Sequence, residues 1–202
     1  MDGKEDGVAA MAATYQGFDP AAYLQYNYTP PGADFENKDS VLLWKMGCLH
    51  RAFTEGDVSG ELLVDIGSGS TLYQVMSGCE IFNKVILTDF LEVNQQELKR
   101  WLRNAEDSAL DWTPFLKHAC MLEGRQPSAW TEKAARLRSV VSDVLYVERA
   151  QPWPPHRLAQ VCASLKKMGF TLIRLEVYTL PQDMRVGVDD VSGVFFAKAM
   201  KD

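Results

Sequence analysis

The amino-acid sequence predicts an α/β fold, in which strands alternate with helices. The first observation is the segment 61–70, Glu-Leu-Leu-Val-Asp-Ile-Gly-Ser-Gly-Ser, an apolar strand that runs into a glycine turn. The second is Asp89, which closes another apolar run twenty positions after Gly69. The third is the order of the predicted segments: strands and helices alternate in the first part of the chain, and a helix followed by two strands ends it. A strand, a glycine turn and a distant carboxylate are together typical of nucleoside-binding α/β folds.

Hydrophobic periodicity then predicts each element in order. The elements are an amphipathic helix within residues 40–53, the first strand before Gly67, a helix opening at 71–76, a strand at 84–89, helices at 92–102 and 133–145, a late helix ending at Gly169, and strands at 171–180 and 193–200. Gly169 is a good C-cap for the late helix because glycine readily adopts positive φ.

Composition sets the class of protein. With 202 residues, 47% of them hydrophobic and 24% charged, the chain is expected to fold as one soluble domain over residues 15–202. The small and polar residues 1–14 are predicted to be a disordered tail. A net charge of −6 argues against a nucleic-acid partner, since phosphate binding relies on clustered Lys and Arg, and it suits a cationic substrate better.

The cysteines and the apolar runs indicate the cellular compartment in which the protein is expected. Four dispersed cysteines with no Cys-x-x-Cys pair predict neither a metal site nor a disulfide framework, so a reducing, cytosolic location is expected. The sequence shows no signal peptide and no uncharged apolar run of about 18 residues, so no membrane partner is expected.

The glycine turn indicates which nucleoside is bound. A dinucleotide fold places a third glycine about three residues on, whereas residues 70–73 are Ser-Thr-Leu-Tyr, which disfavours a nicotinamide-dinucleotide oxidoreductase. Instead Asp65 stands two residues before the first glycine, and Val-Asp-Ile-Gly-Ser-Gly resembles the first motif of S-adenosylmethionine-dependent methyltransferases. On this interpretation Asp65 organises the turn and Asp89 accepts ribose hydroxyls; the alternatives are that Asp65 only caps a turn and that the glycines only form one.

Three longer segments extend the resemblance. They are Tyr-Gln-Gly-Phe-Asp-Pro-Ala-Ala-Tyr-Leu-Gln-Tyr-Asn-Tyr-Thr-Pro-Pro from residue 15, Leu-Val-Asp-Ile-Gly-Ser-Gly-Ser-Thr-Leu-Tyr-Gln-Val from residue 63, and Leu-Thr-Asp-Phe-Leu-Glu-Val-Asn-Gln-Gln-Glu-Leu from residue 87. They resemble the small-amine N-methyltransferases, and most of all the phenylethanolamine branch of that family. The resemblance implies a Rossmann-like methyltransferase fold with an N-terminal helical lid, S-adenosyl-L-methionine as cofactor and a small aromatic amine as substrate.

The resemblance also implies site residues, with Asp89 on the ribose, Phe90 against the adenine and Glu148 on the adenine amino group. The implied cofactor-binding set is Tyr15, Tyr23, Tyr28, Asp65, Gly67, Ser68, Gly69, Thr71, Tyr73, Asp89, Phe90, Asn94 and Glu148. Asn27, Lys45 and Asp189 would line the substrate pocket, and no catalytic residue is assigned. Read from the residues alone, the N-terminal aromatics are either a lid without a ligand or rings that contact a sulfonium and an aromatic substrate.

The chain departs from the family after residue 148. Residues 61–202 are too few for a seven-stranded sheet built from βαβ units of about 30 residues. The sequence passes from Tyr-Val-Glu-Arg-Ala at 146–150 directly into Gln-Pro-Trp-Pro-Pro, with no Pro-Gly-Gly, which predicts an internal deletion near 148–155. The lost block would hold central strands and the family's carboxylates nearest the substrate amine. Each buried backbone group that it leaves unpaired costs about 1–3 kcal/mol.

Two functions follow from these predictions. The first is transfer of a methyl group from S-adenosylmethionine to the amine of an arylethanolamine such as noradrenaline, impaired by the deletion. The alternative is a catalytically inactive, truncated homologue that binds cofactor or modulates a full-length homologue as its partner.

Overall fold

The computed structural model describes residues 15, 17–56, 58–104, 106–147, 158–179 and 193–201. Three predictions fall outside these residues: the disordered tail at 1–14, the deletion point near 148–155, and the positions of Glu148 and Asp189.

A three-stranded parallel sheet forms the centre of the fold. Its strands are β1 (Leu62–Ile66), β2 (Lys84–Asp89) and β3 (Val141–Tyr146), in the order β1-β2-β3. Val64 pairs with Ile86, and Ile86 pairs with Asp143. The strands are parallel, so their carboxyl ends meet at one edge, and that is where ligands bind in open α/β sheets.

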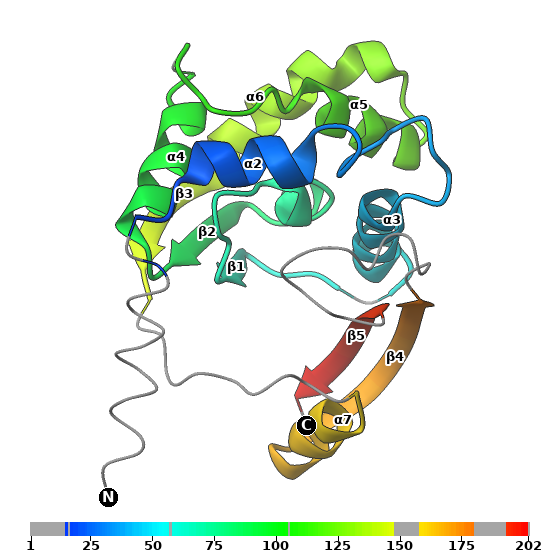
Figure 1. The fold of residues 1–202 in the computed structure, drawn as a ribbon. Helices are drawn as coiled ribbons and strands as arrows, with labels where there is room; N and C mark the ends of the chain where they lie inside the picture. The colour runs from blue at the N-terminus through cyan, green and yellow to red at the C-terminus, as the bar shows by residue number, and fades with distance from the viewer. Residues whose placement is uncertain are drawn as a thin grey trace, which may run out of the picture.

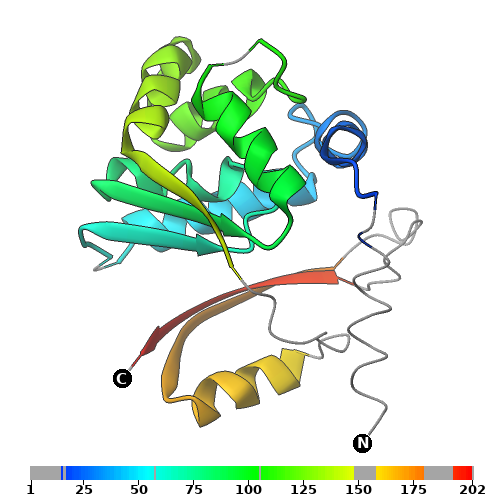
Figure 2. The ribbon, with the colours of Figure 1, turned by 90° about the vertical axis from the view of Figure 1, so that its left-hand side faces the viewer.

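Helices cover one side of this sheet (Figures 1 and 2). They are α4 (Glu92–Leu102), α5 (Thr113–Leu122) and α6 (Trp130–Val140), while α2 (Pro20–Tyr28) lies across the carboxyl ends of the strands (Figure 2). Helix α3 (Val41–Thr54) and the short 3-10 turns η1 (Tyr73–Val75), η2 (Gly78–Glu80) and η3 (Pro127–Ala129) complete this part of the fold. The buried core lies between these helices and the sheet, and includes Leu87, Leu98, Phe115 and Leu137. Burial of these apolar side chains is the main force that holds the helices on the sheet.

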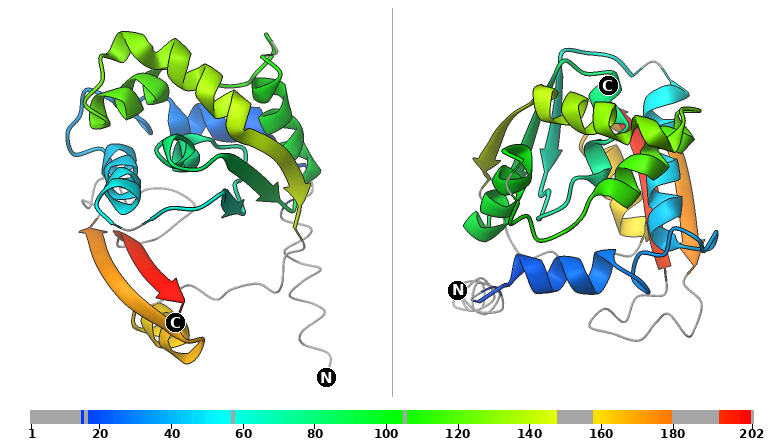
Figure 3. Two further views of the ribbon diagram at one scale, coloured as in Figure 1. Left: turned by 180° about the vertical axis from the view of Figure 1, so that it is seen from behind. Right: turned by 90° about the horizontal axis from the view of Figure 1, so that it is seen from above.

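A second, two-stranded sheet lies apart from the first. β4 (Phe170–Thr179) and β5 (Gly193–Lys201) pair antiparallel, and α7 (Leu158–Lys167) packs against β4 (Figure 2). Among the described residues neither strand pairs with β1, and the views from behind and from above show the two sheets separated (Figure 3). The sheet therefore does not close into one continuous surface here.

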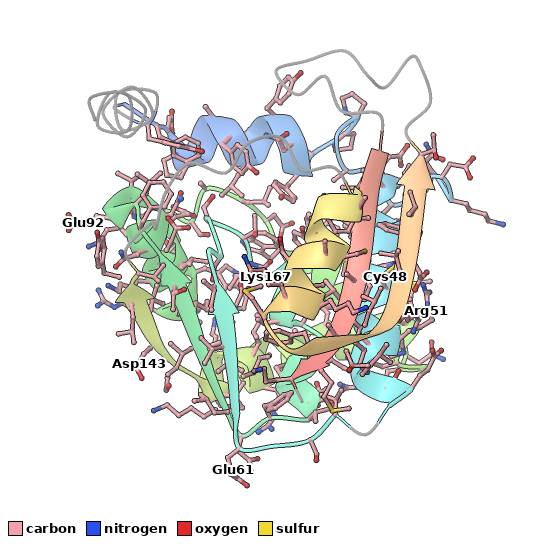
Figure 4. The ribbon with its side chains drawn as sticks, turned by 90° about the horizontal axis from the view of Figure 1, so that it is seen from below. Cys48, Arg51, Glu61, Glu92, Asp143 and Lys167 are labelled. Atoms are coloured by element: carbon pink, nitrogen blue, oxygen red, sulfur yellow. The ribbon has the colours of Figure 1, made fainter. Side chains whose placement is uncertain are left out.

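The second sheet is attached through α3 instead. Arg51 on α3 lies beside the ribbon (Figure 4) and forms an ion pair of 2.7 Å with Glu176 on β4. The rings of Trp44 and Tyr178 lie 5.5 Å apart. Lys198 on β5 donates to the carbonyl oxygen of Ala52 at 2.7 Å. These contacts are mostly polar and half-exposed, so we expect them to hold the β4–β5 ribbon less firmly than shared strand pairing would.

The structure confirms most of the predicted elements and corrects two. The predicted helix at 133–145 is wrong in its second half: α6 ends at Val140 and β3 begins at once, because the β-branched run there pairs with β2. The predicted helix at 71–76 is also wrong. That segment forms the single turn η1 and is shaped by side-chain hydrogen bonds of Gln74, described below. Hydrophobic periodicity did not indicate the helices α2 and α5, which the structure adds.

The free edge and open face of β1 carry exposed apolar side chains. Leu62, Val64 and Ile66 are 47%, 44% and 75% exposed, and on the described residues only β2 pairs with this strand. An exposed, apolar edge strand is a template for pairing with another chain. No helix among the described residues is long and apolar enough to cross a membrane.

We predict that Val64→Lys lowers self-association of the chain. A lysine on an open strand face disfavours pairing between chains, while the free energy of unfolding is expected to change by less than about 1 kcal/mol because little burial is lost. Light scattering across a concentration series, with unfolding in urea, checks both values. Val85→Lys, at a fully buried position of β2, is the matched control and should unfold the protein. Unchanged association in Val64→Lys would contradict the prediction.

Candidate functional site

The glycine turn follows the carboxyl end of β1 and is hydrogen-bonded to the carboxyl end of β2. Gly67 and Gly69 have φ of +78° and +60°, which disfavour any residue with a Cβ atom. The backbone N–H groups of Gly67 and Ser68 both donate to the carbonyl oxygen of Thr88, at 3.0 and 2.8 Å. The Ser68 hydroxyl in turn accepts from the Thr88 N–H at 3.2 Å. These hydrogen bonds hold the turn against the last residues of β2, and Ser68 takes part in them through both its N–H group and its hydroxyl.

Asp89 fixes the other side of the turn. Its Oδ2 accepts from the Gly69 N–H at 2.9 Å, and its Oδ1 accepts from the Leu91 N–H at 2.8 Å and from Asn94 Nδ2 at 3.0 Å. The carboxylate is only 3% exposed. It therefore positions the glycine turn and the start of α4 at once, and Oδ2 keeps one acceptor position.

Gln74 is a residue that sequence reasoning missed. Its Nε2 donates to Asp65 Oδ2 at 2.8 Å and to the carbonyl oxygens of Ser68 and Thr71, and its Oε1 accepts from the Thr71 hydroxyl at 3.0 Å. Asp65 and Thr71, both predicted to contact cofactor, are therefore held by this one side chain. No motif signals Gln74, because its role depends on the folded turn.

The predicted lid aromatics form one continuous row of rings. The row runs from Phe90, after β2, to Tyr73, after the glycine turn, and its members are Phe90, Tyr15, Phe18, Tyr23, Tyr28 and Tyr73. Neighbouring centroids lie between 5.3 and 6.2 Å apart, which is the range of favourable aromatic pairs. Phe18 belongs to the N-terminal aromatics, and it is the one member of the row that was not in the predicted cofactor-binding set. The N-terminal aromatics thus contact Phe90 after β2 at one end of the row and Tyr73 after the glycine turn at the other.

Burial raises the pKa of two tyrosines in this row. Burial raises the pKa of Tyr28 far above its usual range, and the neighbouring Tyr73 and Tyr23 raise it further. Burial likewise raises the pKa of Tyr73. Both phenols therefore stay neutral and can donate a hydrogen bond at any physiological pH.

The predicted substrate residues are only partly placed. Asn27 is half-buried on α2, and its Nδ2 donates to the Tyr23 carbonyl oxygen at 2.9 Å. Lys45 is half-buried on α3, forms no ion pair within the described part of the chain, and has its pKa lowered by burial. Asp189 lies outside the described residues.

Comparison with known proteins gives the family. A profile described as the NNMT/PNMT/TEMT family matches residues 6–159. Phenylethanolamine N-methyltransferase of Homo sapiens is 34% identical over 263 residues, covering 96% of this chain and 93% of that enzyme. The chain belongs to the NNMT/PNMT/TEMT family. Nicotinamide N-methyltransferase of Sus scrofa is 40% identical over 152 residues, covering 74% of this chain and 56% of that enzyme.

Membership of the NNMT/PNMT/TEMT family confirms the predicted family and fold. By family the chain is an S-adenosylmethionine-dependent amine N-methyltransferase. It is also shorter than its relatives. The alignment with the Rattus norvegicus phenylethanolamine enzyme runs over 270 positions and includes 100% of this 202-residue chain, so about 68 positions of that enzyme have no counterpart here.

The residues around the turn fit the family's methyl donor. A Cβ atom built on Gly67 or Gly69 meets nothing within 4 Å, so the backbone of the turn is open to a ligand. Two buried polar atoms beside it, Ser70 Oγ and Asn94 Oδ1, have no hydrogen-bond partner within the described part of the chain. Buried polar atoms left unpaired are costly, and a nucleoside with hydroxyl and amino groups would satisfy them.

We predict that Gln74→Met loosens the turn of this NNMT/PNMT/TEMT-family protein. The thioether fills similar space but makes none of the four hydrogen bonds, so we expect a loss of about 1–2 kcal/mol in the free energy of unfolding. We also expect weaker binding of S-adenosylhomocysteine, by about tenfold. Urea unfolding and calorimetry measure the two. The control is Gln96→Met on the exposed face of α4, which should change neither. Equal behaviour of the two variants would contradict the role of Gln74.

Proposed function

We propose that this chain binds S-adenosylmethionine at the glycine turn and transfers its methyl group to the amine of a small arylethanolamine. The observation that carries the proposal is the row of aromatic rings from Phe90, after β2, to Tyr73, after the glycine turn. The cofactor supplies the methyl group. Three of the roughly four acceptor positions of the Asp89 carboxylate are in use, and the remaining one on Oδ2 would take one ribose hydroxyl.

The protein's own residues would orient the reactants and exclude water. Tyr23, Tyr28 and Tyr73 present phenol rings, which can contact a positive sulfonium through their faces. Asn27 and Lys45 would line the amine side, with Asp189 opposite the polar side chain of the substrate. Catalysis by such a site comes chiefly from alignment of the reacting atoms.

We further propose that turnover is low. The missing positions of the relatives support an internal deletion near 148–155 within one domain at 15–202, and the block that would be lost carries the family's acids nearest the amine. With Asp189 as the remaining acid, proton removal from the amine would have few routes. The alternative is a non-catalytic homologue that binds cofactor and modulates a full-length partner; the open edge of β1 favours a partner of some kind. The cytosolic location stays a prediction.

Calorimetry with S-adenosylhomocysteine, followed by a methyl-transfer assay with noradrenaline and phenylethanolamine, tests the proposal. We expect saturable heat and slow transfer. Heat without transfer would favour the non-catalytic alternative, and addition of full-length phenylethanolamine N-methyltransferase would then show whether its rate changes. The absence of any heat would overturn cofactor binding.

A further inference from the structure

A hollow of about 580 Å³ lies outside the glycine turn, where the end of α2, the loop 29–36 and the start of α5 meet. Its lining is partly apolar, with Tyr28, Pro30, Phe35 and Pro114, and the residues beneath it are well packed. Leu110 and Phe115 are 5% and 1% exposed, and the Phe35 ring stands edge-on to Phe115 at 4.8 Å. Gln25 ties α2 to the segment before α5 through a 2.7 Å hydrogen bond to the Ala109 carbonyl oxygen. The volume falls within the roughly 300–1,000 Å³ of pockets that hold one small molecule.

Three carboxylates stand at the rim of this hollow, those of Asp34, Glu36 and Asp111. None of them forms an ion pair with any described residue. Asp34 Oδ1 accepts from the Glu36 N–H, and Asp111 Oδ1 accepts from the Thr113 N–H, each at 2.9 Å. One oxygen of each aspartate and both of Glu36 are therefore free of backbone bonds. Three like charges around one hollow repel each other, and a bound cation would relieve that repulsion.

We propose that this hollow binds a small arylalkylammonium ion. The aromatic ring would lie against the half-buried Phe35 and the exposed Pro30 and Pro114, and the ammonium group would lie among the three carboxylates. Apolar walls with a few convergent charges are the usual construction of a small-molecule site. A protonated aromatic amine matches both parts, whereas an anion or a neutral hydrocarbon matches at most one.

The hollow is distinct from the proposed cofactor site and shares only Tyr28 with it. Tyr28 lines the hollow, and its ring lies 5.8 Å from Tyr73 of the turn and 6.2 Å from Phe115. Among the described residues, neither Asn27 nor Lys45 lines it. The hollow is thus a second binding site for an amine, and the Tyr28 ring separates it from the glycine turn.

Benzyltrimethylammonium is the probe, because it carries a permanent charge and no nitrogen lone pair to accept a methyl group. Calorimetry and saturation-transfer NMR at low salt should show saturable binding to one site. The double variant Asp34→Asn/Asp111→Asn keeps both backbone-capping oxygens and removes two charges. Each lost charge should weaken binding about fivefold, so the pair should weaken it about 25-fold. The exposed Glu106→Gln, away from the hollow, is the matched control and should bind like the wild type.

Neopentylbenzene, the neutral isostere of the probe, should bind much more weakly. Glu36→Gln provides a second variant, since its side chain makes no hydrogen bond within the described part of the chain, and it should weaken the probe about fivefold. The proposal is overturned by no saturable binding, by equal affinity in the double and control variants, or by equal affinity of the neutral isostere. Because the probe requires no cofactor, failure to bind S-adenosylhomocysteine would leave this result unaffected.

Discussion

Replacement of Asp89 by alanine is expected to lower the free energy of unfolding by about 3–5 kcal/mol. Three donors lose their acceptor: the N–H groups of Gly69 and Leu91 and the side-chain amide of Asn94. Because the site is nearly sealed from water, the donors gain little hydration in return. The glycine turn and the start of α4 then lose their common anchor, so we also expect no measurable binding of S-adenosylhomocysteine.

Unfolding in urea and calorimetry measure both consequences. The matched control is Asp143→Ala on the neighbouring strand β3. That carboxylate is half-exposed, forms a 3.6 Å ion pair with Lys84 and accepts from the adjacent Ser142 hydroxyl, so its loss should cost less than about 1 kcal/mol. Asp89→Asn should fall between wild type and alanine, since one oxygen remains while an amide N–H turns toward another donor. A loss in Asp89→Ala no larger than in the control would contradict the anchoring role.

The part of the site that the sequence predicts is the part with local signals. The apolar run of β2 ends at Asp89, and Gly67 and Gly69 adopt the positive φ that the turn suggested. Helix α4 occupies residues 92–102 as predicted, and Gly169 follows α7 with φ of +74°. Each of these features depends on residues close together in the chain, and short-range periodicity and backbone preference are enough to find them.

Features that depend on the folded shape of the turn or on contacts between distant residues were not predictable. Gln74 matters only because the turn brings Asp65, Ser68 and Thr71 around it. The switch from helix to strand at Val141 depends on pairing with β2, which local periodicity does not contain. The separate β4–β5 ribbon is a third case. Local patterns do not say whether it pairs with β1, because that pairing would join residues about a hundred positions apart.

A second large effect is expected far from the turn, at Lys133 on α6. This lysine is 0% exposed, and its Nζ donates to Glu80 Oε1 at 2.9 Å and to Glu123 Oε1. Lys133→Met should lower the free energy of unfolding by about 3–5 kcal/mol, because it leaves the Glu123 side chain, which is 12% exposed, without its cation. The Glu80 side chain is 36% exposed and keeps part of its hydration. Arg125, at 3.7 Å from Glu123 and 3.8 Å from Glu80, offers partial compensation, so the lower end of that range is expected.

A rescue variant separates an unpaired charge from lost packing. Glu123→Gln added to Lys133→Met removes one of the stranded carboxylates and should recover about 1–2 kcal/mol. The same substitution alone, with Lys133 still present, should destabilise the protein. Urea unfolding measures the effect of Glu123→Gln on the free energy of unfolding with Lys133 present and with Lys133→Met. Effects of opposite sign would show that the unpaired carboxylate charge causes the destabilisation. If Glu123→Gln destabilised both backgrounds equally, the effect of Lys133→Met would be one of packing.

The pH dependence gives an independent check on the same cluster. Burial alone lowers the pKa of Lys133, but the neighbouring Cys79, Glu123 and Glu80 outweigh it, and the net direction is upward from 10.5. A lysine whose pKa is raised by folding contributes stability that is complete below its unfolded pKa and is lost as the pH rises through the folded one. Burial also raises the pKa of the Cys79 thiol, to about 12, so the stability that its neutral form contributes falls over the same alkaline range. The informative quantity is therefore the difference between wild type and Lys133→Met, which should be constant up to about pH 10 and should shrink above it. A difference that stays constant up to about pH 11.5 would mean that the ammonium charge contributes nothing to the stability of the fold.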